Sequence, residues 1–372
     1  MAGGWLSVSQ EKPMPPVHYD ATLEQVAPDE ADTAAELIAT MQRISARTLA
    51  DEDHALRAVH AKSHALLDAT LTVAPDLPPE LAQGLFARGG TYRAALRIST
   101  SPGDLLDDAI STPRGLAIKL FDVPGEQLSG DAADATQDFL LVDGPAFLVA
   151  TPGKFLANVK LLAATTDRAE GLKHAFSTVA RGTERLIEAV GGESGTLIAL
   201  GGHAITHPLG AIYYSQVPFR FGDYVAKLAV VPVDAFAALK DAPVDLDGHY
   251  DGLRIAIGQT LAATGGSWNL RVQLCTDLAR MPIEDAAVEW DETASPFRTV
   301  ARLTVAAQPS WSLQNVAAID DGLAFSPWHG LVAHRPLGGI NRVRRAVYAA
   351  LQADRSARSG CPFIEGVRNA TG

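Results

Sequence analysis

The sequence is poor in cysteine and contains no long hydrophobic run. Its two cysteines, Cys275 and Cys361, lie far apart and form no CxxC motif. This usage excludes a disulfide framework and favours a reducing cytoplasm. No apolar segment approaches the roughly 18 residues of a membrane-spanning helix, and the opening MAGGWLSVSQEKPMPP has no basic region followed by an apolar stretch. We therefore expect a soluble, cytoplasmic protein without a secretory signal.

The sequence also lacks an excess of basic residues. Lys and Arg number 31 against 43 Asp and Glu, which gives a formal net charge of −12. This charge argues against a general binder of nucleic acid or of anionic membranes, so any basic pocket must be local. The composition, 47% hydrophobic and 20% charged, is that of an ordinary globular protein, and 372 residues suffice for a sizeable core.

Hydrophobic periodicity divides the chain into an arm, one domain and a tail. Residues 1–30 are rich in Pro, Gln, Glu and Val and predict an extended arm. Residues 31–358 are expected to form a single domain with its own core, and residues 359–372 a tail. A helix is expected after Asp32, because apolar residues recur there at helical spacing.

Within the domain, short runs with alternating or β-rich content predict strands. These runs are HALLDATLTV, TYRAALRIST, GLAIKLFDV, DFLLVDG, YVAKLAVVPV, NLRVQLCT and RTVARLTVA. Two amphipathic runs, PGKFLANVKLLAATT and RAEGLKHAFSTVARGTERLIEAV, predict helices, and Gly191-Gly192 ends the second. Non-adjacent strands with helices between them predict an α+β fold around a closed or nearly closed antiparallel sheet.

Two common site motifs are rejected. The Gly-rich run GGESGTLIALGG contains no GK[ST], GxGxxG or GxSxG, so it predicts neither a nucleotide loop nor a hydrolase nucleophile. His60 and His64 have the i, i+4 spacing of a helical metal pair. Such a pair needs a helix and a third ligand, and neither is evident.

A stronger signal lies in the last predicted helix, RRAVYAALQADR. Arg344, Tyr348 and Arg355 stay within roughly 40° of one helix face. Alone, this pattern is typical of a solvated basic face with a packed tyrosine. A free phenol has a pKa near 10, so its ionisation at pH 7 costs about 4 kcal/mol. A guanidinium one turn away offers a charge-assisted hydrogen bond of about 1.5–3 kcal/mol, which stabilises the phenolate.

Three separated motifs resemble the haem catalases. The run RAVHAK, from Arg57, matches the family's R-x-x-H-A-K segment, which holds the distal histidine. The run RISTSPGDLLDDAISTPRGLAIK, from Arg97, matches the R-x-S-T…PRG-x-A-x-K segment that follows. The run RRAVYAALQADR reproduces the haem-ligand motif R-x-x-x-Y with a further arginine seven residues later. The likeness extends, with insertions, from about residue 45 to 358.

The resemblance implies a fold and a cofactor. The fold would be a catalase-type antiparallel β-barrel with inserted and C-terminal helices around a buried ferric haem b. Tyr348 would be the axial ligand of the iron, tuned by Arg344. His60 would be the general acid–base that takes a proton from peroxide and returns it to the departing oxygen. Further haem-binding residues implied by the resemblance are Arg57, Arg97 and Arg355, at the propionates, and Val59, beside the distal histidine.

The chain departs from the family around the distal histidine. Ser99 matches the serine that orients this histidine, but the family's second distal group, an asparagine, is not evident. In DATQDFLLVDGPAF the nearest amide is Gln137, which we expect to assist His60. The C-terminal flavodoxin-like domain of large catalases has no counterpart. Val59 stands where the related allene oxide synthases carry threonine. This difference favours a catalase or peroxidase activity over that of an allene oxide synthase.

Three functional hypotheses follow. The first is an enzyme that consumes hydrogen peroxide or an organic hydroperoxide, as a catalase or as a peroxidase with an unidentified electron donor. The second is rearrangement or peroxygenation of a lipid-like hydroperoxide, in a channel lined by the apolar run from Phe139 to Phe147. The third is a haem-binding protein that has lost turnover, with Gln137 as the lesion. A homo-oligomer is expected from the family likeness alone, and no nucleic-acid or membrane partner is expected.

Overall fold

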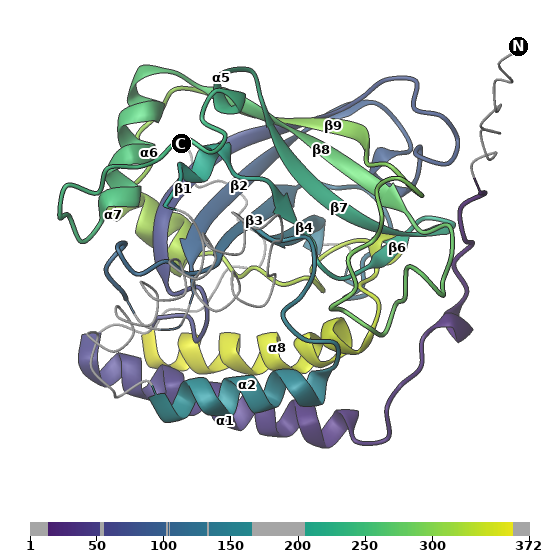
Figure 1. The fold of residues 1–372 in the computed structure, drawn as a ribbon, viewed down its shortest axis with the longest axis horizontal. Coiled ribbons are helices and arrows are strands. Elements are labelled where there is room, and N and C mark those ends of the chain that lie inside the picture. The colour runs from purple at the N-terminus through teal and green to yellow at the C-terminus, as the bar shows by residue number, and fades with distance from the viewer. Residues whose placement is uncertain are drawn as a thin grey trace, which may run out of the picture.

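The computed structural model describes residues 14–52, 56–101, 103, 105–131, 134–165 and 205–359. Within these residues, nine strands form one antiparallel sheet in the order β5-β4-β3-β2-β1-β9-β8-β7-β6. A further pairing of β5 with β7 closes eight of the strands into a barrel, and β6 pairs with β7 (Figure 1). The strands are β1 (Lys62–Val73), β2 (Gly90–Thr100), β3 (Arg114–Phe121), β4 (Thr136–Val142), β5 (Tyr213–Tyr214), β6 (Phe219–Phe221), β7 (Tyr224–Val233), β8 (Gly266–Leu274) and β9 (Arg298–Val305).

The barrel is filled by apolar side chains from alternate strand positions. From Leu67 to Val73, for example, β1 alternates buried apolar residues with exposed ones. The inward side chains of all the long strands join one core cluster, in which Leu96, Leu228 and Trp268 are fully buried. Burying each such side chain contributes about 1.5–3 kcal/mol, so the two-residue period fixes which face of each strand points inward.

Three helices lie side by side against one side of the barrel (Figure 1). They share a second apolar cluster, to which each contributes buried residues such as Leu37, Val159 and Val347. None of the helices in the described part of the chain is long and apolar enough to cross a membrane. The helices of this layer are α1 (Glu30–Glu52), α2 (Pro152–Thr165) and α8 (Gly339–Ser359), and the others are α5 (Asp234–Ala237), α6 (Gly252–Ala263) and α7 (Leu313–Asn315).

The predicted α+β fold with a closed antiparallel barrel is confirmed. Each of the seven predicted strand runs contributes to a strand, and the helix expected after Asp32 begins two residues earlier, at Glu30. The sequence analysis missed α6, because Gly252, Gly258 and two isoleucines lower its helix propensity and only packing on the barrel favours it. The helix predicted to end at Gly191-Gly192 lies outside the described residues, as does Cys361.

The described part of the N-terminal arm is tied to the barrel and to α8. Val17 N donates to Cys275 O at 2.7 Å, and only a short 3₁₀ turn interrupts the arm before α1. Arg342 of α8 donates to carboxylate oxygens of Glu24 (2.7 Å), Glu30 (2.8 Å) and Glu284 (2.9 Å). One guanidinium therefore joins the arm, the start of α1 and a loop of the barrel to α8.

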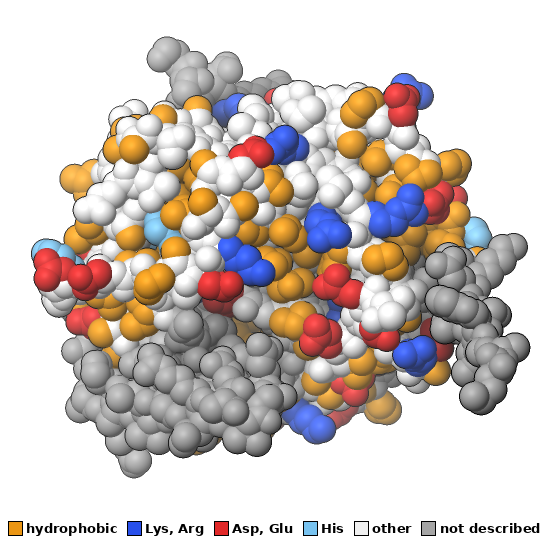
Figure 2. Space-filling view, turned by 45° about the horizontal axis from the view of Figure 1, so that its top comes forward, with side chains coloured by type: hydrophobic (Ala, Val, Ile, Leu, Met, Phe, Trp, Pro, Cys, Tyr) orange, Lys and Arg blue, Asp and Glu red, His pale blue; other side chains and the backbone are white. Residues whose placement is uncertain are grey.

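Over the face shown in Figure 2, acidic and basic side chains are interspersed among apolar ones. The excess of acidic residues in the sequence is therefore not gathered on this face into a patch of one sign.

The Arg342 cluster predicts a large loss of stability on truncation. The substitution Arg342→Ala leaves three carboxylates without their shared cation, and removing one partner from a largely buried ion pair typically costs about 3–5 kcal/mol. Urea denaturation followed by circular dichroism measures this loss. The matched control is Arg298→Ala, whose pair with Glu80 is largely exposed and should contribute less than about 1 kcal/mol. Equal losses of stability in Arg342→Ala and Arg298→Ala would contradict the stabilising role of the Arg342 cluster.

Candidate functional site

A cavity of about 1540 Å³ lies between the barrel and the helical layer. Its wall includes the residues before β1, the ends of β2, β3 and β4, and residues of α1, α2 and α8. Of the residues singled out from the sequence, those that line it are Arg57, Val59, His60, Arg97, Ser99, Arg344, Tyr348 and Arg355. Three motifs that are distant in the sequence therefore meet at one cavity.

On the α8 side, the cavity presents a phenol bonded to a guanidinium. Arg344 Nη2 donates to Tyr348 Oη at 3.1 Å, and the guanidinium carbon lies 5.3 Å from the centre of the tyrosine ring. The two side chains meet because residues four apart are neighbours on a helix, and RRAVYAALQADR consists mainly of good helix formers. Arg344 is held in turn by Asn341 Oδ1 at 3.3 Å.

Three arginines converge on Asp320 at another part of the wall. Arg97 Nε donates to Asp320 Oδ1 at 2.7 Å, and Arg57 Nη1 contacts the same oxygen. Arg355 Nη1 donates to the main-chain oxygen of Asp320 at 2.8 Å, so α8 joins the same cluster. Asp320 is the penultimate residue of the π-helix Val316–Asp321, and no sequence motif predicts its role.

The cluster is electrostatically strained. Burial by itself would raise the pKa of the Asp320 carboxyl, but Arg97 and Arg57 outweigh it and hold this pKa well below its usual range. Burial, together with repulsion from Arg355 and Arg97, lowers the pKa of the Arg57 guanidinium well below its ordinary value. Burial also lowers the pKa of Arg355 to about 10. Three buried guanidiniums that repel one another form a site where added carboxylates would be favourable.

On the barrel side, His60 is held against the start of β3. A Cβ added to Gly115 would lie 2.8 Å from His60 Nδ1 and 3.3 Å from Ser99 Oγ, so only glycine leaves room for the imidazole. His60 itself has φ = 54°, in the left-handed region that non-glycine residues rarely occupy. Among the described residues, its buried Nδ1 has no hydrogen-bond partner. Strain and an unpartnered polar atom are both typical of functional sites.

The surroundings of His60 lower its pKa to about 4. Burial is the main cause and repulsion from Arg97 the second, while Asp143 opposes them and Arg344 adds a smaller repulsion. The imidazole is therefore neutral at pH 7, with a nitrogen that can accept a proton.

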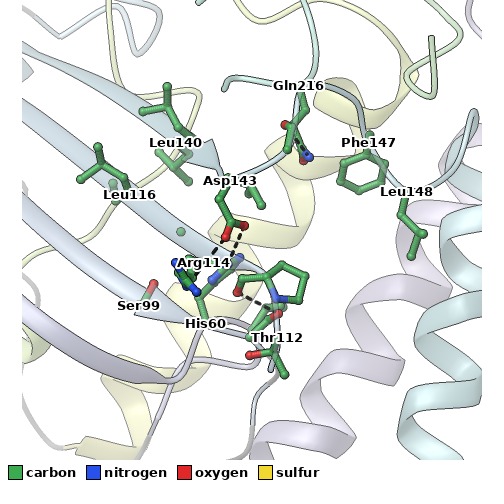
Figure 3. A pocket seen from close by; sticks show the side chains of 18 of the residues that line it. His60, Ser99, Thr112, Arg114, Leu116, Leu140, Asp143, Phe147, Leu148 and Gln216 are labelled. Carbon is green, nitrogen blue, oxygen red and sulfur yellow. Dashed lines mark hydrogen bonds and ion pairs between the residues drawn. The ribbon is translucent and has the colours of Figure 1, made fainter. Parts of the chain in front are cut away.

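Gln137 does not assist His60, and that prediction is wrong. Its side chain is 2% exposed and lies away from the cavity, where Oε1 accepts from Leu331 N at 3.0 Å and Nε2 donates to Asp138 O at 3.0 Å. The alternation in β4 explains the error, because Gln137 shares the inward face of Phe139 and Leu141. The polar residue that lines the cavity from this segment is Asp143, just after β4 (Figure 3). The sequence analysis missed it because it searched for an amide.

His64 is not a partner of His60 in a metal pair. Lys62 begins β1, so the two histidines do not share a helix, and His64 Nε2 lies 2.9 Å from Thr100 Oγ1. No group of three or more His, Cys, Asp or Glu side chains within the described ranges is arranged to hold a metal ion.

The donor set of the cavity fits a haem. Tyr348 with Arg344 can present a phenolate to ferric iron, and the strained cluster of Arg57, Arg97 and Arg355 can receive two propionates. His60 comes from the barrel, whereas Tyr348 comes from the helical layer, so a flat ring between the two layers could contact both.

Comparison of the structure with solved structures identifies the fold. A fungal catalase aligns with a TM-score of 0.57 at 17% identity, over 85% of this chain and 61% of that one. A bacterial catalase aligns with a TM-score of 0.55 at 16% identity, over 84% of this chain and 59% of that one. Catalase A from Saccharomyces cerevisiae aligns with a TM-score of 0.55 at 13% identity, over 93% of this chain and 68% of that one. The chain is a catalase-fold protein that spans about three fifths of the length of the first two structures. No family model matches its sequence, and no curated protein does.

The Asp320 cluster predicts a pH-dependent stability difference. The substitution Asp320→Asn removes the carboxylate that Arg57 and Arg97 share, so it should cost about 3 kcal/mol at pH 7. Because the folded-state pKa of Asp320 is depressed, its contribution is complete above the unfolded pKa near 4 and is lost as the pH falls further. Urea denaturation at pH 7 and pH 3 should show the difference from wild type shrinking at the lower pH. The control, exposed Asp68→Asn, should change stability by less than about 0.5 kcal/mol. A stability difference between wild type and Asp320→Asn that is larger at pH 3 than at pH 7 would contradict the stabilising role of the Asp320 carboxylate.

Proposed function

We propose that this protein binds ferric haem b in the cavity and uses it to reduce a peroxide. One observation carries the proposal: a guanidinium-bonded phenol and a buried, neutral imidazole line the same cavity in a catalase fold. When bound, haem supplies the iron centre at which the O–O bond of a peroxide is broken. The protein's own contribution is to hold the cofactor and to move protons.

Tyr348 and the arginine cluster would bind the cofactor at two places. The Arg344 guanidinium donates to the phenol oxygen and so stabilises its anionic form, which is the form that binds iron. Arginine suits this place because it keeps its charge when buried. The propionates would lie against Arg57, Arg97 and Arg355 and relieve the mutual repulsion of these side chains.

His60 would move the proton. A neutral imidazole accepts the proton of the peroxide O–H, and the imidazolium that forms then donates it to the oxygen that leaves. The ring lies against the backbone of Gly115, which limits the rotation that would take the nitrogen out of reach. Val59, also on the wall, adds an apolar neighbour that does not compete for this nitrogen.

A second candidate is an organic hydroperoxide with an apolar chain, which would be rearranged or used for peroxygenation. The observation that favours it is an apolar wall formed by Leu140, Phe147, Leu148 and Phe155, with the rings of Phe147 and Phe155 5.1 Å apart. Phe139, included in the expected channel, packs instead in the barrel core. The hypothesis that Gln137 is a lesion loses its basis, because that side chain does not reach the cavity.

The first functional prediction concerns the iron ligand. Haem-loaded wild type should show the Soret and charge-transfer bands of a ferric phenolate complex, and Tyr348→Phe should lose haem or these bands. The measurement is the absorption spectrum after loading and desalting. Tyr214→Phe, at another part of the cavity wall, is the matched control and should keep the spectrum. A Tyr348→Phe spectrum identical to wild type would contradict the ligand assignment.

The second functional prediction concerns the proton-moving group. Because the pKa of His60 is about 4, peroxide consumption should be constant from about pH 8 to 5 and should fall as the pH drops through 4, where the imidazole becomes protonated. His60→Gln should retain haem and lose at least about 100-fold in the rate of peroxide loss. Oxygen release, donor oxidation and the products of a fatty-acid hydroperoxide are followed in parallel to identify the reaction. An unchanged rate in His60→Gln would show that His60 is not the base.

A further inference from the structure

Asp143 is fixed at the edge of the cavity by the first residue of β3. Arg114 N donates to Asp143 Oδ1 at 2.8 Å, and Asp143 N donates to Arg114 O at 3.0 Å. The Arg114 Nε lies 3.9 Å from Asp143 Oδ2, and Arg114 Nη1 donates to Thr206 Oγ1 at 3.1 Å. The carboxylate therefore has a defined place and a defined counter-ion.

The loop that follows Asp143 is also fixed. Gln216 Nε2 donates to Gly144 O at 3.1 Å and to Ala146 O at 2.7 Å. Gln216 is itself in the left-handed region, with φ = 60°, so the fold tolerates backbone strain to make these two bonds. This arrangement restrains the backbone directly after the carboxylate.

Strand register brings the carboxylate to His60. The imidazole lies over Gly115, and Gly115 pairs with Val142, the residue immediately before Asp143. In Figure 3, Asp143, Arg114 and His60 lie together at the ends of the barrel strands, with Ser99 beside the imidazole. His60 and Asp143 are therefore neighbours through the pairing of β3 and β4, although 83 positions separate them in the sequence (143 − 60).

Arg114, from β3, is the counter-ion of Asp143. Within the described part of the chain, the other charges that act on His60 are the positive side chains of Arg97, from β2, and Arg344, from α8. Each disfavours an imidazolium, and burial disfavours it further. Among these groups Asp143 alone carries a negative charge that favours protonation of the ring.

We propose that Asp143 is a positioning residue that supplies the counter-charge for the imidazolium form of His60. The carboxylate lies beside an imidazole that must become cationic for an instant while it carries the peroxide proton, and it stabilises that cation across space. The proton passes from the peroxide O–H to the imidazole and then to the departing oxygen, and Asp143 itself neither gains nor loses it. This inference rests on the proposed function of the cavity.

The alternative is that Asp143 only ties β4 to β3. Asn in its place keeps the side-chain oxygen that accepts from Arg114 N and removes only the charge. Asp143→Asn therefore separates the two roles, because a purely structural residue would tolerate this change without altering the protonation of His60.

The first experiment measures His60 directly. The full-length protein without haem is labelled with ¹³C at histidine Cε1, and the ring signal of His60, identified by its absence in His60→Gln, is titrated by NMR from pH 7 to 3.5. In wild type this signal should begin to shift near pH 5. In Asp143→Asn the shift should move at least about one pH unit lower, the ordinary effect of one nearby charge. Circular dichroism checks that both proteins remain folded.

The second experiment measures peroxide loss by the haem-loaded protein over the same pH range. Asp143→Asn should fall about tenfold in rate, which corresponds to one unit of pKa. The control is Asp122→Asn, an exposed residue at the other end of β3, which should match wild type in both experiments. A His60 titration that is unchanged or moves upward in Asp143→Asn would overturn the inference. If Asp143→Asn lowers the pH at which His60 titrates but wild type consumes no peroxide, Asp143 still acts as the counter-charge of His60 and the proposed function is wrong.

Discussion

Asp320 connects the parts of the protein that form the cavity. Its carboxylate and its main-chain oxygen bind arginines from the segment before β1, from β2 and from α8. Together with the Arg342 cluster, these bonds restrain the helical layer against the barrel, because apolar contacts between the two layers are not directional. A buried carboxylate with charged partners accepts only a narrow range of geometries, so it fixes where α8 presents Tyr348 relative to His60.

The alternation of apolar residues sufficed to predict all seven long strands and the closed sheet, because each strand buries one face in a single core. The phenol–guanidinium pair was also predictable, since helical spacing alone brings Arg344 to Tyr348. Asp320 and Asp143 were not predictable in this way. Asp320 gains its partners only through tertiary contacts, and Asp143 reaches His60 only through the register of β3 and β4. The error over Gln137 was avoidable, because the same alternation places it with Phe139 and Leu141.

The structure has the fold of the catalases at 13–17% identity, and it places a carboxylate, Asp143, beside His60, the histidine that we propose moves the proton. A carboxylate offers only acceptors, whereas the asparagine of the family offers donors as well. Asp143 can therefore support the protonated state of His60 but cannot donate a hydrogen bond to a departing oxygen. If the proposed function is correct, the cavity would combine a phenolate ligand with a proton-transfer site that differs from the family pattern.

The crystal structure of the haem-loaded protein tests the central claim most directly. The account predicts a haem between barrel and helical layer, with Tyr348 Oη bonded to iron, His60 facing the opposite side of the ring and the propionates on Arg57, Arg97 and Arg355. Haem bound through another residue, or a loaded protein whose cavity contains no haem, would contradict it.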